Sequence, residues 1–186
     1  RLAESIGSKR VIWRYDPILF TPRYTPEYHI RAFRQMAEAL RGCTEKCVIS
    51  FVDTYAKNAR KLQALGVYEL PKEELESFAA TLCAIARENG MVMASCSEEI
   101  DLAHCGITHN ACIDKVLIEE ITGCKLKGTR DRNQRKECGC MESIDIGTYH
   151  TCANGCVYCY ANHSDARVKE ARAMYNVHSP ILCGRI

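Results

Sequence analysis

The chain has 186 residues, of which 47% are hydrophobic and 26% charged, and its formal net charge is +2. This composition is that of a globular protein long enough to bury a core. The small net charge gives no electrostatic reason to expect a nucleic-acid or membrane partner. No apolar run approaches the ~18 residues that a membrane-spanning helix needs, so we expect none.

Apolar runs and amphipathic stripes alternate along the chain. Runs of β-branched and aromatic residues predict buried strands at residues 9–20, 46–53 and 91–97. Apolar stripes with start and stop signals predict helices at residues 25–42, 55–66, 71–90, 97–106 and 164–176. Thr25 is the expected N-cap of the first of these helices, with Pro26 in its first position. Ser97 is the expected N-cap of the fourth.

This alternation predicts an α/β fold, in which covering helices pack on a parallel sheet of near-continuous apolar strands. Three strands are too few for a closed barrel. We therefore expect a partial (β/α) barrel whose N-terminal part is missing from the chain and would be its partner. Residues 1–7 support this expectation, because they resemble the second half of an amphipathic helix that ends at Gly7.

The character of the sequence changes near residue 125. Residues 125–163 are polar, rich in glycine and cysteine, and low in periodicity, which is typical of a functional or disordered segment. We expect residues 1–124 to form the α/β region and residues 125–186 to form a cysteine-rich region of the same domain.

The chain has 13 cysteines, an unusually high number for 186 residues. Secreted disulfide scaffolds are usually short and poor in regular helix, whereas this chain has long helical patterns and an odd number of cysteines. We therefore expect reduced thiols in a cytoplasmic protein, several of them metal ligands. A disulfide framework and inert buried thiols are the alternatives.

Three cysteines lie within the stretch TYHTCANGCVYCYANH, residues 148–163: Cys152, Cys156 and Cys159. Such short spacing lets one loop wrap its thiolates around a single metal centre. Together with Cys138 and Cys140 this loop could supply four thiolates to zinc. Alternatively, three thiolates could hold three irons of a cubane cluster and leave the fourth iron open. A metal with an open coordination position can bind a reacting molecule, as in catalytic sites, whereas the metal of a structural site is fully coordinated by the protein.

The C-x3-C-x2-C spacing, with Tyr158 directly before the last cysteine, resembles the signature of the radical S-adenosylmethionine (SAM) superfamily. The resemblance implies a 4Fe–4S cluster in a C-terminal loop, with SAM bound to its open iron and cleaved to a 5′-deoxyadenosyl radical. Tyr158 and Tyr160 would shield the cluster from water, and Asn162 flanks it on the cofactor side. The triplet follows the predicted strands here, whereas in the superfamily it follows the first strand, and no Gly-Gly-Glu-type segment is present.

A wider resemblance rests on VIWRYDPILFT, CVISFVD, CGCMESIDIGTYHTCANGCVYCYAN and SPILCG. These segments are similar to the bacterial family catalogued as domain of unknown function 1848. Members of that family carry a C-terminal cysteine cluster like that of radical SAM proteins, and a further region before the WRYDP strand. The family implies no substrate.

Four other cysteines could hold a second iron–sulfur cluster or a zinc ion: Cys96, Cys112, Cys138 and Cys140. The C-x-C pair lies in a polar loop, which does not suit core packing, and Cys96 follows a predicted strand, where parallel α/β folds place functional groups. The alternative is that Cys96 and Cys112 pack as small hydrophobic residues. Cys47 and Cys83 are expected in the core.

Charged residues in apolar strands are costly unless they are paired. Arg14 and Asp16 have the same parity in the first strand and point to the same side. They could bind substrate or the SAM carboxylate at the mouth of the barrel together with Asp53, or form a structural ion pair.

These observations predict a radical SAM-like enzyme that uses a 4Fe–4S cluster and SAM on an unknown substrate. A reductant such as flavodoxin or ferredoxin would supply its electron. The alternative is a non-catalytic protein whose iron–sulfur cluster carries electrons or stabilises the fold, or which binds zinc.

Overall fold

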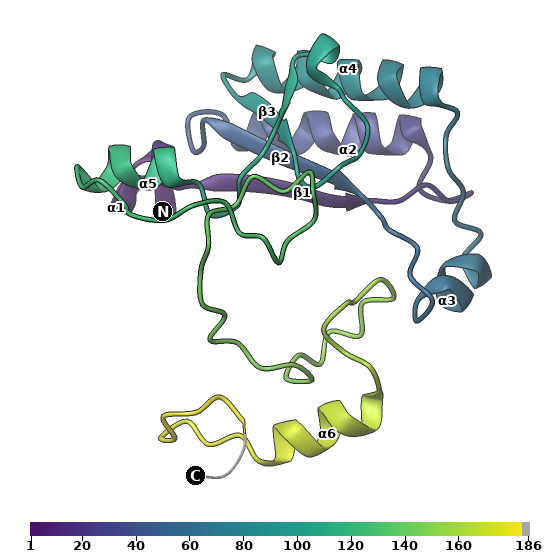
Figure 1. Cartoon of the computed structure of the whole chain (residues 1–186). Coiled ribbons are helices and arrows are strands. Elements are labelled where there is room, and N and C mark those ends of the chain that lie inside the picture. The colour runs from purple at the N-terminus through teal and green to yellow at the C-terminus, as the bar shows by residue number, and fades with distance from the viewer. Residues whose placement is uncertain (184–186) are drawn as a thin grey trace. The chain divides into compact units, whose positions relative to one another are not determined.

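The computed structural model of the chain describes residues 1–183. Figure 1 shows these residues, which form two compact units. The first unit contains residues 1–52 and 67–143. The second contains residues 53–66 and the described residues from 144 onward. The first unit therefore holds the sheet and its helices, and the second holds the cysteine loop of residues 148–163.

The described residues of the first unit form one sheet of four parallel strands in the order β1-β2-β3-β4. The strands are β1 (Ile12–Ile18), β2 (Lys46–Phe51), β3 (Val92–Ser95) and β4 (Ile107–His109). Each new strand joins the sheet beside the preceding one, as in a singly wound barrel, whereas a doubly wound sheet reverses its order. The predicted α/β class with a partial barrel-like parallel sheet is confirmed.

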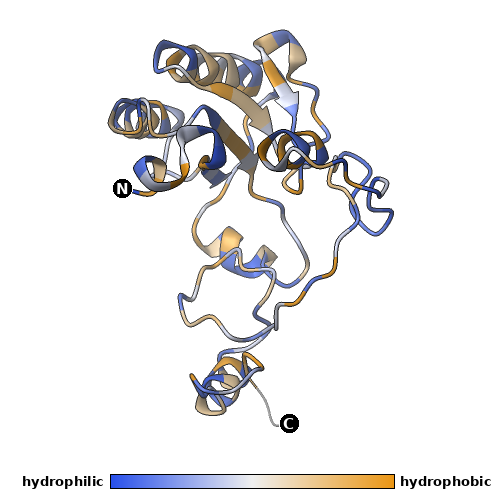
Figure 2. Cartoon of the chain, turned by 90° about the vertical axis from the view of Figure 1, so that its left-hand side faces the viewer, coloured by the Kyte–Doolittle hydropathy of each residue, from blue (hydrophilic) through white to orange (hydrophobic). Residues whose placement is uncertain are grey.

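The core lies between this sheet and two long helices, α2 (Pro26–Ala39) and α4 (Lys72–Glu88) (Figure 1). Cys47 and Ile49 share one face of β2, and both are fully buried against residues of α2 and α4 such as Phe33 and Leu82. Both helices therefore cover the same face of the sheet. Figure 2 colours them in a mixture of orange and blue, as expected of amphipathic helices.

The predicted start of α2 is confirmed. Pro26 is the first helical residue, and the Thr25 Oγ1 accepts a hydrogen bond from the backbone N–H of Tyr28 at 3.3 Å. This bond satisfies one of the donors that a helix leaves unpaired at its N-terminus. The cores of the other expected helices are α4 in the first unit, and α3 (Ala59–Ala64) and α6 (Asp165–Ala173) in the second.

The helix predicted from Ser97 is wrong. Ser97 has φ 55, a left-handed conformation, and residues 97–102 form no helix. A short 3₁₀ turn, η2 (Ala103–Cys105), leads instead into β4, which the sequence analysis missed. It also missed α5 (Lys115–Thr122), which begins where the Asp114 Oδ1 accepts from the N–H groups of Val116 and Leu117.

The N-terminal residues form two short elements, α1 (Leu2–Ile6) and η1 (Ser8–Arg10), before β1 begins. Gly7 separates them with φ 87. Its N–H donates to the Ala3 carbonyl and closes the helical turn. Among the described residues, no helix combines the length and the apolar composition that crossing a membrane requires.

Candidate functional site

The first unit gathers polar and thiol side chains near the carboxyl ends of its strands. Arg14 lies near the middle of β1 and Asp16 lies in its second half, while Cys96 follows β3 directly. Asn110 and Cys112 follow β4. Since the carboxyl ends of parallel strands meet at one edge of a sheet, these residues from distant parts of the chain become neighbours.

Arg14 joins this edge of the sheet to the thiols. Its guanidinium forms an ion pair with Asp16, and its Nη1 donates a hydrogen bond of 3.1 Å to the Sγ of Cys112. Burial by itself lowers the pKa of Arg14, but hydrogen bonds to the thiols and to Asp16 outweigh it and raise the pKa above its ordinary value. Arg14 is therefore a fixed cation beside sulfur.

Cys96 and Cys112 are in direct contact, with 3.3 Å between their Sγ atoms. The hydrogen bond from Cys112 and the nearby guanidinium of Arg14 lower the pKa of Cys96 to about 5. The same hydrogen bond and burial raise the pKa of Cys112. The two pKa values are therefore shifted in opposite directions, and Cys96 is the more acidic thiol of the pair.

The C-x-C segment lies against the loop that carries Cys112. The Sγ of Cys140 accepts hydrogen bonds from the backbone N–H groups of Cys112 and Ile113, at 3.1 and 3.3 Å. Cys138 interacts with Cys140 and with the Ser97 hydroxyl. Cys138 and Cys140 are only 6% and 7% exposed. We call Cys96, Cys112, Cys138 and Cys140 the four-cysteine cluster.

Gly139 explains how the C-x-C segment approaches so closely. A Cβ at this position would lie 3.1 Å from the Asn110 carbonyl oxygen and 3.4 Å from the Ala111 Cβ. Any larger residue would have to push the C-x-C segment away from the Asn110–Ala111 backbone. The absence of a side chain at Gly139 therefore keeps both flanking thiols beside Cys112.

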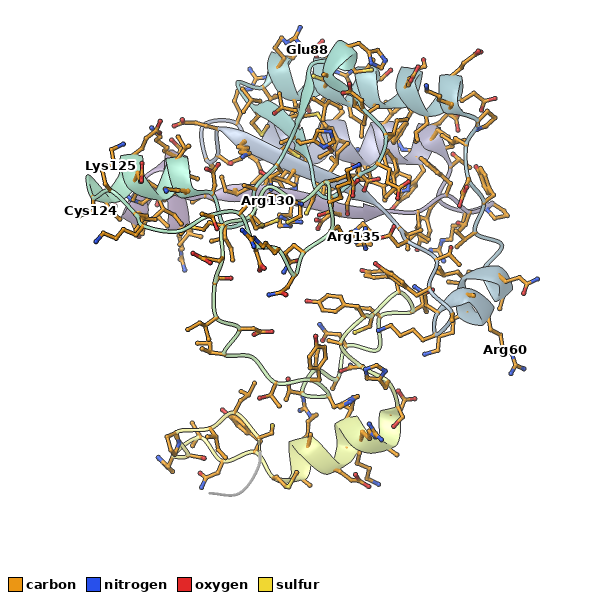
Figure 3. The ribbon with its side chains drawn as sticks, viewed as in Figure 1. Arg60, Glu88, Cys124, Lys125, Arg130 and Arg135 are labelled. Atoms are coloured by element: carbon orange, nitrogen blue, oxygen red, sulfur yellow. The ribbon has the colours of Figure 1, made fainter. Side chains whose placement is uncertain are left out.

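Arg130 forms hydrogen bonds with the backbone that leads into the C-x-C segment. Its Nε donates to the Cys138 carbonyl at 2.7 Å, and its Nη2 donates to the carbonyls of Arg135 and Lys136, both at 2.6 Å. Figure 3 shows Arg130 and Arg135 on the loop that follows α5. Arg130 therefore fixes the backbone before Cys138.

The structure thus brings together the four cysteines that were predicted as a second metal site. Within residues 1–183, no group of three or more His, Cys, Asp or Glu side chains is arranged as the ligand set of one metal ion. The Asn110 Nδ2 lies 3.5 Å from the Cys112 Sγ, and its buried Oδ1 has no hydrogen-bond partner among the described residues. The sequence analysis did not single out Asn110, because a lone Asn in a loop carries no signal.

In the second unit, residues 148–163 form the cysteine triplet loop. The N–H of Cys159 donates to the Cys156 carbonyl at 3.1 Å, which makes a tight turn between the last two cysteines. The Asn162 Nδ2 donates to the Cys152 carbonyl at 2.7 Å, and Lys57 donates to the Tyr160 carbonyl. These bonds hold the backbone, while Cys152 and Cys156 remain exposed and Cys159 half-buried, all as free thiols.

Two pockets border the triplet loop. One, of about 480 Å³, is lined by Cys152, Asn162 and Arg172 among others. The other, of about 220 Å³, is lined by Cys156, Cys159, Asn162 and Lys57 among others. Asn162 lines both, and its Oδ1 is buried without a hydrogen-bond partner among the described residues.

The donor set of the triplet loop fits an iron–sulfur cluster. Thiolates are the ligands that such clusters use. The three cysteines belong to one short loop that lies outside the hydrophobic core. The unsatisfied Asn162 oxygen is an acceptor beside them, suited to an N–H or O–H group of a bound molecule. Of the flanking predicted residues, Tyr160 is 70% exposed. Asp53 also belongs to this unit and accepts a hydrogen bond of 3.1 Å from the Tyr55 hydroxyl.

The remaining predicted thiols lie in the core. Cys47 is fully buried in β2, and burial raises its pKa to about 12. Cys83 is 5% exposed on the inner face of α4. Both predictions are confirmed.

A family model described as "Domain of unknown function (DUF1848)" matches residues 1–161. The matched range contains the four-cysteine cluster and all three cysteines of the triplet loop. No curated protein and no solved structure matches the chain.

Proposed function

The chain belongs to the DUF1848 family of domains of unknown function, and from this premise we propose that it is a radical SAM-like iron–sulfur enzyme. Cys152, Cys156 and Cys159 would each bind one iron of a 4Fe–4S cluster, leaving the fourth iron for SAM. The observation that carries the proposal is the triplet loop: three free thiols border two pockets, and Asn162, whose Oδ1 has no hydrogen-bond partner among the described residues, lines both.

When bound and reduced, a cluster of this kind supplies the electron that cleaves SAM and starts radical chemistry. The chain's own residues hold and shield it. Asn162 ties the loop through the Cys152 carbonyl and keeps one acceptor free for a bound molecule. Tyr158 would limit the access of water, which affects the potential of a cluster, whereas the exposed Tyr160 would shield it less.

Polar residues outside the triplet loop have separate proposed roles. Arg14 suits a carboxylate, because its planar guanidinium can donate two parallel hydrogen bonds. Arg14, Asp16 and Asp53 are the proposed catalytic polar residues. A cytoplasmic flavodoxin or ferredoxin would be the reductant.

The test is reconstitution of the full-length protein with iron and sulfide under anaerobic conditions, followed by reduction in the presence of SAM. We expect a brown protein that releases 5′-deoxyadenosine, detected by liquid chromatography. Cys156→Ala should lose both the cluster and the product. Cys124→Ala is the matched control, because Cys124 is an exposed thiol far along the chain from the triplet loop.

Two outcomes would sink the proposal. A stable cluster that never cleaves SAM would favour the alternative, a non-catalytic iron–sulfur protein. Stoichiometric zinc on the triplet loop of colourless, anaerobically purified protein would favour a structural zinc protein.

A further inference from the structure

We propose that Cys96, Cys112, Cys138 and Cys140 form a second metal site, which takes a single thiophilic ion such as Zn²⁺ in a four-thiolate shell. The site lies in the first unit, and its residues are separate from the triplet loop of the second. The proposal therefore does not rest on the proposed SAM chemistry.

The first argument is convergence from three distant segments. The four cysteines form a series of contacts: Cys96 touches Cys112, the Cys112 N–H donates to Cys140, and Cys140 interacts with Cys138. Cys138 also interacts with Ser97, the residue that follows Cys96. Such convergence of thiols from a strand end, a loop and a C-x-C segment is what a thiolate metal site needs.

The second argument is the separation of the sulfurs. Tetrahedral zinc with Zn–S bonds of 2.3 Å places its ligand sulfurs about 3.8 Å apart. The Cys96 and Cys112 sulfurs are 3.3 Å apart, close to that value. In a cubane cluster each thiolate binds a different iron and the sulfurs stand further apart. For the Cys96–Cys112 pair this contact favours one ion over a second cluster. The other two sulfurs reach the ion only after the rearrangement described below, because within residues 1–183 no three such ligands already surround one ion.

The third argument is the set of donors aimed at sulfur. Cys140 accepts two backbone N–H bonds, and Cys112 accepts from Arg14 at 3.1 Å and lies 3.5 Å from the Asn110 amide. Four thiolates around a divalent cation carry a net charge of −2. A guanidinium and directed N–H groups compensate that charge and orient the ligands. Packing as small hydrophobic residues requires none of them, and Cys112 is exposed.

Binding includes a closing step. The thiols release their protons to solvent, and the Cys138 and Cys140 side chains rotate until their sulfurs join the other two around the ion. The backbone is already fixed for this. Arg130 holds the Cys138 carbonyl, the Asp131 N–H donates to the Cys140 carbonyl at 2.9 Å, and the Met141 N–H donates to the Ile113 carbonyl at 3.1 Å.

The test uses the full-length chain with the triplet removed, as C152A/C156A/C159A, so that bound metal cannot be assigned to that loop. After anaerobic purification and exchange with Zn²⁺, elemental analysis should give about one zinc per chain. Adding Cys112→Ser should reduce zinc to background, whereas adding Cys124→Ser should not. Replacing Zn²⁺ with Co²⁺ should give the intense absorption bands of tetrahedral cobalt thiolate.

Three results would overturn the proposal. The first is no zinc above background in the triplet-free chain while its circular dichroism shows a folded protein. The second is iron with sulfide at this site, which would mean a cluster. The third is a Cys96–Cys112 disulfide recovered by peptide mass analysis of protein incubated with Zn²⁺, which would mean a redox pair. If the triplet-free chain does not fold, zinc and cobalt are measured on the unmodified chain with Cys112→Ser against Cys124→Ser.

Discussion

Arg14 and Cys112 lie 98 positions apart in the sequence, yet the Arg14 Nη1 donates a hydrogen bond of 3.1 Å to the Cys112 Sγ. Arg14 comes from an edge strand, and Cys112 comes from the loop after the strand at the opposite edge. The cation meets the thiol because the parallel sheet assembles with both strands in it and the loop after β4 reaches Arg14. The contact therefore depends on the fold of the first unit, and it places a positive charge beside the four-cysteine cluster.

Replacing Arg14 with Leu should weaken zinc binding by the four-cysteine cluster by roughly 10-fold, because residues that support metal ligands typically matter by 10- to 100-fold. Competition with a coloured zinc chelator measures the change. Arg14→Lys keeps the positive charge and should recover part of the affinity. Equal affinities in all three proteins would show that the cation does not support the thiolates.

Replacing Arg130 with Met should leave three backbone carbonyls without their donor and loosen the segment before Cys138. The expected result is faster hydrogen exchange in residues 135–140, together with faster loss of zinc to the chelator. Arg130→Lys retains charge but cannot reach three carbonyls with a planar fork, so it should resemble Met more than Arg. Protection unchanged in Arg130→Met would contradict the assigned role.

Adding one methyl group at Gly139 should destabilise the first unit by about 1–3 kcal/mol, the usual cost of overpacking a close contact. The new Cβ would meet backbone, the Asn110 carbonyl oxygen, at 3.1 Å. Gly147→Ala is the control, because its Cβ would meet the end of the Asp145 side chain rather than backbone, and moving that end disturbs only its hydrogen bond from the Gly147 N–H. Urea unfolding followed by circular dichroism compares the two. A control as damaging as Gly139→Ala would remove the steric explanation.

His29 should make stability depend on pH. It is 8% exposed, its Nδ1 lies 2.7 Å from the Tyr15 hydroxyl, and its Nε2 lies 3.0 Å from the Leu19 carbonyl. Burial lowers the pKa of His29 in the folded protein. The unfolded chain therefore takes up a proton near pH 6.5 while the folded chain does not, and stability falls as the pH decreases below that value.

Urea unfolding at pH 7.5 and 5.5 measures this loss. His29→Gln lacks the titrating ring, so its stability should fall less between the two pH values. The difference between the two proteins isolates His29 from the carboxylates that also titrate in acid. An equal fall in both would exclude His29 as the source.

Replacing Asn162 with Leu should speed the loss of iron from a reconstituted triplet loop by roughly 10-fold, since the Cys152 carbonyl loses its donor. The loss is followed as bleaching of the cluster absorbance in the presence of a chelator. Asn162→Asp tests the free acceptor, because a carboxylate keeps oxygen at the site but cannot donate to Cys152. If the Asp and Leu variants lose iron at the same rate, the hydrogen bond donated by the Asn162 Nδ2 stabilises the loop and the Oδ1 acceptor does not.

The sequence predicted the elements whose signals are local. The Thr25 cap, Pro26 and the apolar stripe of α2 are read within one segment, and so is α4. The strand β4 has only three residues and only one of them is buried, so no periodic pattern marks it. The turn at Ser97 depends on a left-handed backbone that serine rarely adopts, whereas a serine before acidic residues is typical of a helix cap.

The candidate sites were partly predictable for a related reason. Cys96 was placed at a strand end because the strand itself was visible in the sequence. The bonds from Cys112 to Cys140 and from Arg130 to Cys138 depend on how loops fold back, which composition and spacing do not encode. Nothing in the basic stretch around Arg130 distinguishes the one arginine that binds backbone carbonyls from its solvated neighbours.

The second unit is built from two stretches of chain, and Lys57 on the first bonds to the Tyr160 carbonyl on the second, 103 positions later. During synthesis at about 5–20 residues per second, the 77 residues between positions 66 and 144 take roughly 4 to 15 s to make. For that time residues 53–66 have no partner stretch to fold with. The ribosome therefore imposes an order in which the sheet can form before the triplet loop is enclosed, so metal delivery to that loop is the late event.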